Sequence, residues 1–412
     1  MLGASRLLSL IVVVTLMQAA PAALAEWPQW RGPTRDGVDP GPAWPESIGE
    51  ENLKQLWRVE LGPSYSGPIV AEGKVFTTAT IDKQTEHVYA YDVASGERLW
   101  EASWDGAMEV PFFAARNGSW IRATPAYSDG LLYVASIRDV LVCLDTADGS
   151  ERWRVDLAEK YGSGVPKFGC ASSPLVHGDG VYVQAGGGFC KLNKQTGEVA
   201  WRVAADGGGM MGGAFSSPAF AEIAGRPQML VQTRTALKGI EPETGEEFFS
   251  QPIEAFRGMN ILTPTVVGDA VFTSAHSGKS QLWRLTGAAG GIEVAEAWQD
   301  KAKAYMSSPV VVDGHAYMHL QNQRITCLDL EKGEETWRSK PYSKYQSMVT
   351  QGDRILALDA EGELLLLKAE PAEFTLLESR RVSEDECWAY LAVSGGRVFV
   401  RELNALAVYS WE

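Results

Sequence analysis

The sequence contains no cluster of basic residues. Its 412 residues include 52 Asp and Glu but only 37 Lys and Arg, which gives a formal net charge of −15. Proteins that bind nucleic acid or anionic membranes gather Lys and Arg on one surface. The composition therefore argues against both kinds of partner.

Several other features are missing or scarce. After the first residues no hydrophobic run approaches the roughly 20 residues that cross a membrane. Only five histidines are present, no two cysteines are adjacent, and no Cys-x-x-Cys spacing suggests zinc. We therefore expect no membrane span and no metal site. The five cysteines leave an odd count, and the sequence does not decide whether Cys170 and Cys190 pair.

The N-terminus has the features of a secretory signal peptide. Arg6 precedes an apolar stretch from Leu7 to Met17, and Ala23-Leu24-Ala25 fits a small-x-small cleavage site. We expect residues 1–25 to be removed after Ala25, which places the mature chain in the periplasm or outside the cell. Because no cysteine lies near the cleavage point, a lipoprotein is not expected.

One spaced motif recurs along the chain. Asn193 is followed four residues later by Gly197 and four residues after that by Trp201. Asp or Asn can accept hydrogen bonds from its own turn, and Gly adopts the positive φ that such turns need. The motif therefore predicts a hairpin whose second strand carries a large aromatic side chain. The other copies are Asp92/Gly96/Trp100, Asp145/Gly149/Trp153, Glu241/Gly245/Phe249 and Asp329/Gly333/Trp337.

Short strand-like runs separate these motifs and give four strands per repeat. Repeats of roughly 40–50 residues with four strands are typical of β-propeller blades. We predict an all-β, eight-bladed propeller of four-stranded antiparallel blades. Seven blades remain an alternative, because the fifth and seventh repeats depart from the turn pattern. The aromatic residues expected to dock the blades are Trp57, Trp100, Trp153, Trp201, Phe249, Trp298 and Trp337, with Phe374 in the seventh repeat.

The two ends of the chain complement each other. Gln55 to Leu61 matches the last strand of a repeat, whereas the C-terminus supplies three strand-like runs and then stops. Pairing of the two ends would close the ring and remove an exposed sheet edge. We thus expect a propeller over residues 55–412. Residues 26–54, rich in Pro, Gly and Trp, are expected to form an ordered arm across it.

The motif from Asn193 to Trp201 resembles the repeat of the PQQ-like, quinoprotein-type β-propeller family. The resemblance extends from about Gln55 to the C-terminus, and in that family the repeat tryptophan packs against neighbouring blades. The segment from Trp27 to Pro33 is also similar to the start of many exported bacterial propellers of this type.

The resemblance implies two different functions. In the quinone-dependent alcohol dehydrogenases, PQQ lies between a tryptophan and an adjacent Cys-Cys disulfide, beside a calcium ion. This chain has no such cysteine pair and no recognisable calcium ligands. The BamB-like branch contains non-catalytic eight-bladed propellers of the outer-membrane protein assembly machinery. Chain length and blade count fit this branch better, although its members are usually lipid-anchored.

Function is expected in the loops that enter the first strand of each blade. These loops converge on one face of a propeller, and here they carry aromatic and basic side chains suited to an acidic or aromatic ligand or to a peptide. The alternative interpretation is that they only cap the central channel. The candidate binding residues are Arg116, Trp120, Arg122, Lys167, Arg257, Asn260, Tyr305 and Trp388.

We predict a monomeric, exported, non-catalytic scaffold that binds another envelope protein or a small ligand and is related to outer-membrane protein assembly. No catalytic residue and no cofactor are expected. The alternatives are a PQQ-binding oxidoreductase that uses the axial pocket, and a propeller that binds saccharides or polymers.

Overall fold

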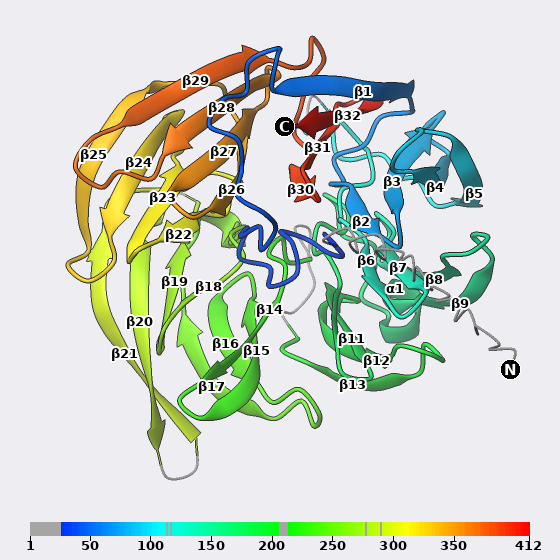
Figure 1. The fold of residues 1–412 in the computed structure, drawn as a ribbon. Coiled ribbons are helices and arrows are strands. Elements are labelled where there is room, and N and C mark those ends of the chain that lie inside the picture. The colour runs from blue at the N-terminus through cyan, green and yellow to red at the C-terminus, as the bar shows by residue number, and fades with distance from the viewer. Residues whose placement is uncertain (1–25, 113, 116–117, 206–212, 277, 289–290) are drawn as a thin grey trace, which may run out of the picture.

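A computed structural model describes residues 26–112, 114–115, 118–205, 213–276, 278–288 and 291–412. The predicted signal peptide and Arg116 lie outside these residues. Eight four-stranded antiparallel sheets surround a central axis, as the ribbon shows (Figure 1). The prediction of an eight-bladed all-β propeller is confirmed, and the seven-bladed alternative is excluded.

The strands of the first four blades follow one another along the chain. Blade 1 contains β2 (Ile69–Ala71), β3 (Lys74–Ile81), β4 (Thr85–Asp92) and β5 (Arg98–Asp105). Blade 2 contains β6 (Ala126–Ser128), β7 (Leu131–Ala135), β8 (Val140–Asp145) and β9 (Glu151–Asp156). Blade 3 contains β10 (Leu175–His177), β11 (Gly180–Ala185), β12 (Gly188–Asn193) and β13 (Val199–Val203). Blade 4 contains β14 (Ala219–Ile223), β15 (Arg226–Gln232), β16 (Ala236–Ile240) and β17 (Glu247–Pro252).

The remaining blades repeat this order. Blade 5 contains β18 (Thr265–Val267), β19 (Ala270–Ser274), β20 (Ser280–Ala288) and β21 (Gly291–Asp300). Blade 6 contains β22 (Val310–Val312), β23 (His315–His319), β24 (Arg324–Asp329) and β25 (Glu334–Pro341). Blade 7 contains β26 (Gln346–Gln351), β27 (Arg354–Asp359), β28 (Glu363–Lys368) and β29 (Thr375–Arg381). Two short helical segments, α1 (Leu157–Tyr161) and η2 (Phe256–Gly258), lie in connecting loops.

Blade 8 joins the two ends of the chain. Its order is β1 (Leu53–Glu60), β32 (Ala405–Trp411), β31 (Arg397–Arg401) and β30 (Ala392–Ser394). Strand β1 pairs antiparallel with β32, from Leu53 opposite Trp411 to Glu60 opposite Ala405. The predicted ring closure is therefore correct. The closing strand starts at Leu53, two residues before the predicted start.

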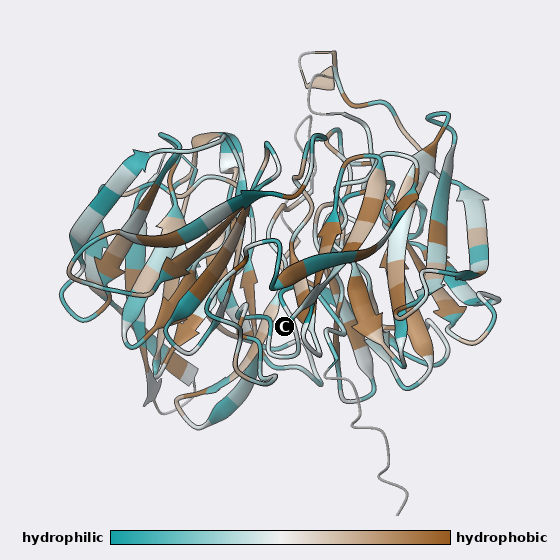
Figure 2. Ribbon diagram, turned by 45° about the horizontal axis from the view of Figure 1, so that its top comes forward, coloured by the Kyte–Doolittle hydropathy of each residue, from teal (hydrophilic) through white to brown (hydrophobic). Residues whose placement is uncertain are grey.

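The core lies between the blades. Apolar residues are concentrated on the strands, while hydrophilic residues occupy the loops and outer strands (Figure 2). Each inner strand is covered by a neighbouring blade on both faces, so every residue of strands such as β7 and β11 is buried. This arrangement explains why the inner strands read as continuous hydrophobic runs.

The repeat motif fastens each blade to the next. The indole Nε1 of Trp100 in blade 1 donates to the carbonyl of Thr146 in the turn of blade 2, at 2.9 Å. Gly149 of that turn has φ +75°, and a Cβ added to it would lie 2.6 Å from the Trp100 ring. Glycine is therefore required for both backbone conformation and close packing. Equivalent indole bonds start from Trp57, Trp153, Trp201, Trp298 and Trp337.

Two joints use a different contact. Blade 4 carries Phe249, which has no N–H to donate, and its ring is buried with Leu285 and Ile292 of blade 5. Blade 7 has no aromatic residue within its outer strand, since Phe374 lies just before β29 and packs against Trp337. Phe374, expected to dock this blade from its fourth strand, thus lies in the turn, one residue before that strand begins.

The joint between blades 7 and 8 uses the arm instead of an aromatic fastener. The carboxylate of Glu378 on β29 accepts from the Ser47 hydroxyl and the Ile48 N–H, both at 2.7 Å. Arg380 donates to the carbonyl of Gly49 at 3.2 Å. These residues lead directly into β1, so the arm holds the closing strand against blade 7. We refer to this contact as the seam.

The arm, residues 26–52, crosses the centre of one face of the ring (Figure 1). Trp27 forms a two-bond bridge with Val70 in blade 1, at 2.9 Å in each direction. Further along, Asp39 N–H donates to the carbonyl of Thr350 in blade 7, at 2.9 Å. The arm therefore connects blades 1 and 7, which flank the closing blade 8.

Two arginines of the arm are buried near the axis. Arg35 donates to the carbonyls of Pro174 and Ser173 in blade 3, at 2.8 and 3.1 Å. Arg31 donates to the hydroxyl of Tyr390 in blade 8 at 3.1 Å. Burial, with Arg31 nearby, lowers the pKa of Arg35 to about 9. Arg35 thus satisfies backbone carbonyls of blade 3, and Arg31 ties the arm to blade 8.

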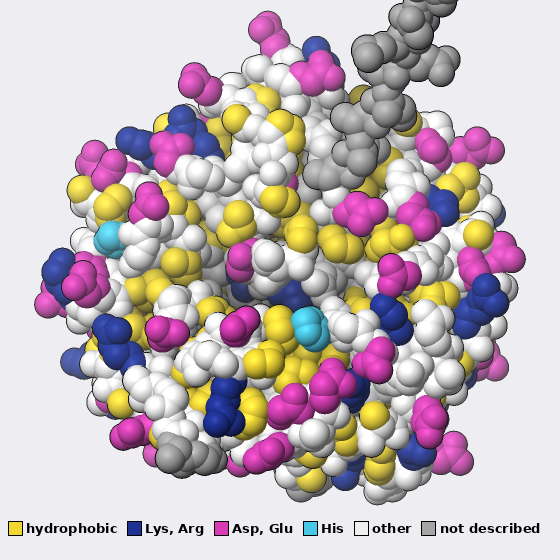
Figure 3. All heavy atoms as spheres, turned by 60° about the horizontal axis from the view of Figure 1, so that its bottom comes forward, with side chains coloured by type: hydrophobic (Ala, Val, Ile, Leu, Met, Phe, Trp, Pro, Cys, Tyr) yellow, Lys and Arg dark blue, Asp and Glu magenta, His cyan; other side chains and the backbone are white. Residues whose placement is uncertain are grey.

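The surface carries no large basic patch on the face shown in Figure 3, where acidic side chains are scattered among basic ones around a hollow centre. Within the described residues no helix is long and apolar enough to cross a membrane. All five cysteines are free and buried. This settles the open question of Cys170 and Cys190, which do not form a disulfide.

Candidate functional site

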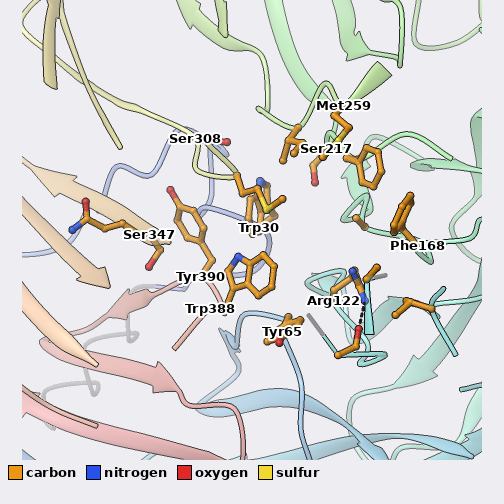
Figure 4. Close-up of a pocket in the computed structure, with 18 residues that line it drawn as sticks. Trp30, Tyr65, Arg122, Phe168, Ser217, Met259, Ser308, Ser347, Trp388 and Tyr390 are labelled. Carbon is orange, nitrogen blue, oxygen red and sulfur yellow. Dashed lines mark hydrogen bonds between the residues drawn. The ribbon is translucent and has the colours of Figure 1, made fainter. Parts of the chain in front are cut away.

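The loops that enter the inner strands meet around a cavity of about 210 Å³ on the axis. Every blade contributes at least one lining residue, as expected from the convergence of these loops, and the arm adds Trp30 (Figure 4). The walls are mainly apolar and aromatic. The lining residues are Trp30, Tyr65, Val110, Ala114, Gly118, Arg122, Phe168, Ala171, Phe215, Ser217, Met259, Ile261, Met306, Ser308, Gln346, Ser347, Trp388 and Tyr390.

A belt of hydroxyl groups fixes the starts of the inner strands. The N–H of Thr124 donates to the Ser173 hydroxyl, and the N–H of Ser173 donates to the Ser217 hydroxyl, both at 2.9 Å. The N–H of Thr263 donates to the Ser308 hydroxyl at 3.1 Å. Each bond joins one blade to the next. The Ser-Pro and Thr-Pro steps that open the repeats therefore hold the base of the cavity rigidly.

The arm closes the cavity from below. The Trp30 ring lies 4.5 Å from the Tyr390 ring, centroid to centroid, and its indole N–H donates to the Thr263 hydroxyl at 3.0 Å. The Tyr390 hydroxyl in turn donates to the carbonyl of Met348 at 2.7 Å. The cavity is therefore closed on the side of the arm by an aromatic floor.

Arg122 brings a positive charge into this apolar setting. Its guanidinium makes two long hydrogen bonds of 3.3 Å, to the carbonyls of Trp120 and Gly118. Burial lowers its pKa to about 10. The described lining residues include no carboxylate, and no ion pair involving Arg122 is found within the described residues. The side chain keeps part of its surface exposed, so a ligand entering the cavity can reach the guanidinium and supply a counter-charge.

Stacked aromatic rings form one side of the mouth. Trp388 lies parallel to Tyr345, with centroids 3.8 Å apart and planes 8° apart, and it also contacts Tyr65 at 4.5 Å. Tyr305 stacks on the other side of Tyr345 at 5.7 Å. Burial raises the pKa of Tyr65 and of Tyr345, so both phenols are neutral at physiological pH. The stack makes this wall stiff and uncharged.

The structure brings only some of the predicted site residues together. Arg122 and Trp388 line the cavity. Trp120 supplies a carbonyl to Arg122, and Tyr305 lies behind the stack.

Three further predicted residues lie elsewhere. Lys167 and Arg257 are exposed, and Arg257 lies over the Phe256 ring at 5.0 Å. Asn260 is buried and donates to the carbonyls of Thr233 and Arg234, both at 3.1 Å, so its described contacts are structural. In each of these loops a neighbouring apolar residue faces the axis: Phe168, Met259 and Ile261.

The cavity also uses residues that sequence reasoning did not select. Trp30 belongs to the predicted arm, for which no ligand-binding role is expected, yet it forms the floor of the cavity. Tyr390, Phe215 and Met306 also line the cavity. Their common signal is position: each lies two to four residues before an inner strand. Within a loop the sequence does not show which side chain turns inward.

The lining does not match the ligand set of a quinone and calcium site. Among the described residues no group of three His, Cys, Asp or Glu side chains is placed to hold a metal ion. Arg122 is the cation among the described lining residues, and neither histidine nor carboxylate accompanies it. The chain also has no adjacent cysteines.

Comparisons with known proteins agree with this architecture. A family model described as outer membrane protein assembly factor BamB matches residues 47–116 and 84–339. Outer membrane protein assembly factor BamB of Yersinia pestis is 24% identical over 269 residues, which is 59% of this chain and 64% of that protein. The chain thus covers less than two thirds of that relative's length.

Solved structures share the fold at low sequence identity. BamB from Moraxella catarrhalis superposes with a TM-score of 0.62 at 16% identity, covering 87% of this chain and 98% of that one. A europium-containing methanol dehydrogenase gives a TM-score of 0.53 at 10% identity, covering 94% and 98%. These likenesses establish the propeller and do not separate binding from catalysis. Because the family model covers more than half of the chain, the protein belongs to the PQQ-like β-propeller family described as outer membrane protein assembly factor BamB.

Proposed function

We propose that this protein is a non-catalytic, exported propeller of the cell envelope that binds another envelope protein during outer-membrane protein assembly. It acts as a monomer, without a cofactor, and engages its partner through the face on which the inner loops converge. The observation that carries the proposal is the blind apolar cavity on this face, to which every blade contributes.

Exposed hydrophobic side chains occur on the same loops that supply lining residues of the cavity. Phe112, on the blade 2 loop, has 90% of its surface exposed. Phe256, on the blade 5 loop, has 52% exposed, and Val165, before blade 3, has 38%. Large apolar side chains grouped around a pocket are typical of protein interaction sites. They supply an apolar rim outside a preformed cavity.

The cavity chemistry supports binding over catalysis. The hydroxyls of Ser217, Ser308 and Ser347 accept backbone N–H groups from neighbouring blades. No histidine or carboxylate stands beside them among the described lining residues. A nucleophilic serine needs an adjacent base. These serines therefore have a structural part, and the quinone-dependent alternative has no supporting ligand set.

In-cell photo-crosslinking tests the proposal. A benzophenone amino acid is placed at Phe112 on the cavity face or, as control, at Leu376 on the outer strand of blade 7, which is 37% exposed. We expect the Phe112 position, and not the control, to form an adduct with an outer-membrane assembly protein. Deletion of the gene should also lower the amount of β-barrel proteins in the outer membrane. Normal β-barrel levels and equal labelling at both positions would contradict the proposal.

A further inference from the structure

The shape of the cavity limits what can occupy it. Its volume of about 210 Å³ lies below the roughly 300–1,000 Å³ of pockets that hold drug-sized ligands. Trp30 closes the floor, so a chain cannot pass through. A blind cavity of this size accommodates one large side chain and little else. An internal segment would need a groove to enter and leave.

The walls favour an apolar or aromatic occupant. The Phe168 and Phe215 rings lie 6.0 Å apart, and Phe168 and Trp388 lie on different sides of the cavity (Figure 4). Met259 and Met306 add unbranched, polarizable side chains, which adapt to the shape of a ligand. These residues can surround a ring or a branched aliphatic side chain.

Arg122 favours a ligand with one negative charge. It stands in the wall between Tyr65 and Phe168 (Figure 4). Its two hydrogen bonds, both 3.3 Å, go to neutral carbonyls, which leaves the charge uncompensated within the described residues. A carboxylate offers the guanidinium short, charge-assisted hydrogen bonds. The ligand should therefore combine an apolar body with one carboxylate.

In a polypeptide these two groups occur on a single apolar residue only at the C-terminus. An internal Asp or Glu has the charge without the apolar body, and an internal Phe or Leu has the body without the charge. We propose that the cavity binds the C-terminal residue of a partner polypeptide, with its apolar or aromatic side chain between the rings and its carboxylate on Arg122. This proposal rests on the proposed function and specifies the chemistry of the partner.

Binding of synthetic peptides to the full-length mature protein tests the proposal. Four probes are compared by calorimetry: a decapeptide ending in Phe with a free carboxylate, the same peptide as its C-terminal amide, the same peptide ending in Ser, and N-acetylphenylalanine. We expect the Phe carboxylate peptide to bind best. The amide should bind about 10- to 100-fold more weakly, since a charge-assisted bond is lost.

Matched variants locate the site. Arg122→Gln should remove the difference between acid and amide, whereas Arg257→Gln, on the same face but outside the lining, should keep it. Arg122→Lys retains the charge and should keep a smaller preference, which provides a second variant if the Gln substitution perturbs folding. Thermal unfolding of each variant verifies that the ring is intact.

The outcomes separate this proposal from the proposed function. Equal binding of acid and amide by the wild type would overturn the C-terminal assignment. Binding of N-acetylphenylalanine as tight as that of the peptide would identify a small-acid site instead. In either case a crosslink at Phe112 would still support a protein partner. Loss of that crosslink together with retained peptide preference would leave the pocket chemistry standing and reject the envelope role.

Discussion

The fastener between blades 1 and 2 can be tested by a double-mutant cycle on Trp100 and Gly149. Trp100 is only 8% exposed, and its indole N–H bonds to the Thr146 carbonyl at 2.9 Å. Trp100→Ala removes a large buried ring and leaves that carbonyl without its partner. We expect it to lower the free energy of unfolding by about 3–5 kcal/mol. Trp100→Phe keeps most of the packing and should cost about 1–2 kcal/mol.

Gly149→Ala probes the same contact from the other side. The new Cβ would lie 2.6 Å from the Trp100 ring at a backbone φ of +75°. The positive φ alone costs about 1–2 kcal/mol in an L-residue, and the steric clash adds about 1–3 kcal/mol. In the Trp100→Ala background the clash disappears, while the φ cost remains. The two substitutions should therefore couple by about 1–3 kcal/mol.

Urea unfolding followed by circular dichroism and fluorescence measures these values, provided that the two probes give coincident transitions. Leu99→Ala on the same strand is the control, because Leu99 is 45% exposed and should change stability by less than about 0.5 kcal/mol. If Gly149→Ala costs the same with and without Trp100, the ring does not impose the glycine, and the proposed basis of the repeat is wrong.

Three further predictions concern charge, thiols and ring closure. Burial raises the pKa of Asp139 to about 6, above its unfolded value of about 3.9. Between about pH 4 and 6 the folded state therefore holds a proton that the unfolded state releases. The free energy of unfolding should fall as pH rises through this range. Asp139→Asn keeps an oxygen to accept the Gly186 N–H and should gain up to about 3 kcal/mol relative to wild type across that window; parallel pH profiles of urea unfolding would refute this. The five buried cysteines should resist a thiol reagent in the native protein and react in denaturant, also without reductant; fewer than five reactive thiols in denaturant would indicate a disulfide. Deleting β32 leaves β1 without its partner and should abolish the native monomer on size exclusion, whereas a folded monomer would show that this pairing is dispensable.

Most of the fold could be predicted because its determinants are local and repeated. Asp92, Asp145 and Asn193 each accept N–H groups from their own turn, as the motif implies. The blade count and the ring closure followed from spacing and from the strand at the N-terminus. The start of β29, one residue after Phe374, does not follow in the same way, because the seventh turn lacks the Asx pattern. The role of Glu378 and Arg380 at the seam depends on a contact between distant segments, which spacing does not reveal.

The site was harder to predict because it depends on which side chain of each loop turns toward the axis. Lys167 and Phe168 are neighbours, yet Phe168 lines the cavity and Lys167 is exposed. Burial of the apolar member and hydration of the charged one explain this choice. The composition of the arm does not reveal that Trp30 forms the floor, because its contact with Tyr390 joins segments 360 positions apart in the chain. Arg122 and Trp388 line the cavity, each four residues before an inner strand; their part in ligand binding stays a prediction.

Ligand binding and the stability of the closed ring both depend on the arm. Trp30 forms the floor of the cavity, and some twenty residues later Ser47 and Ile48 hold the seam between blades 7 and 8. If the arm detaches as one segment, the cavity loses its floor and the closing strand loses its brace. A ligand that rests on Trp30 then favours the attached state and, by thermodynamic linkage, slows amide hydrogen exchange in β1 and β29. Ligand binding in the axial cavity would thus change hydrogen exchange at the outer edge of the ring, through a segment that belongs to no blade.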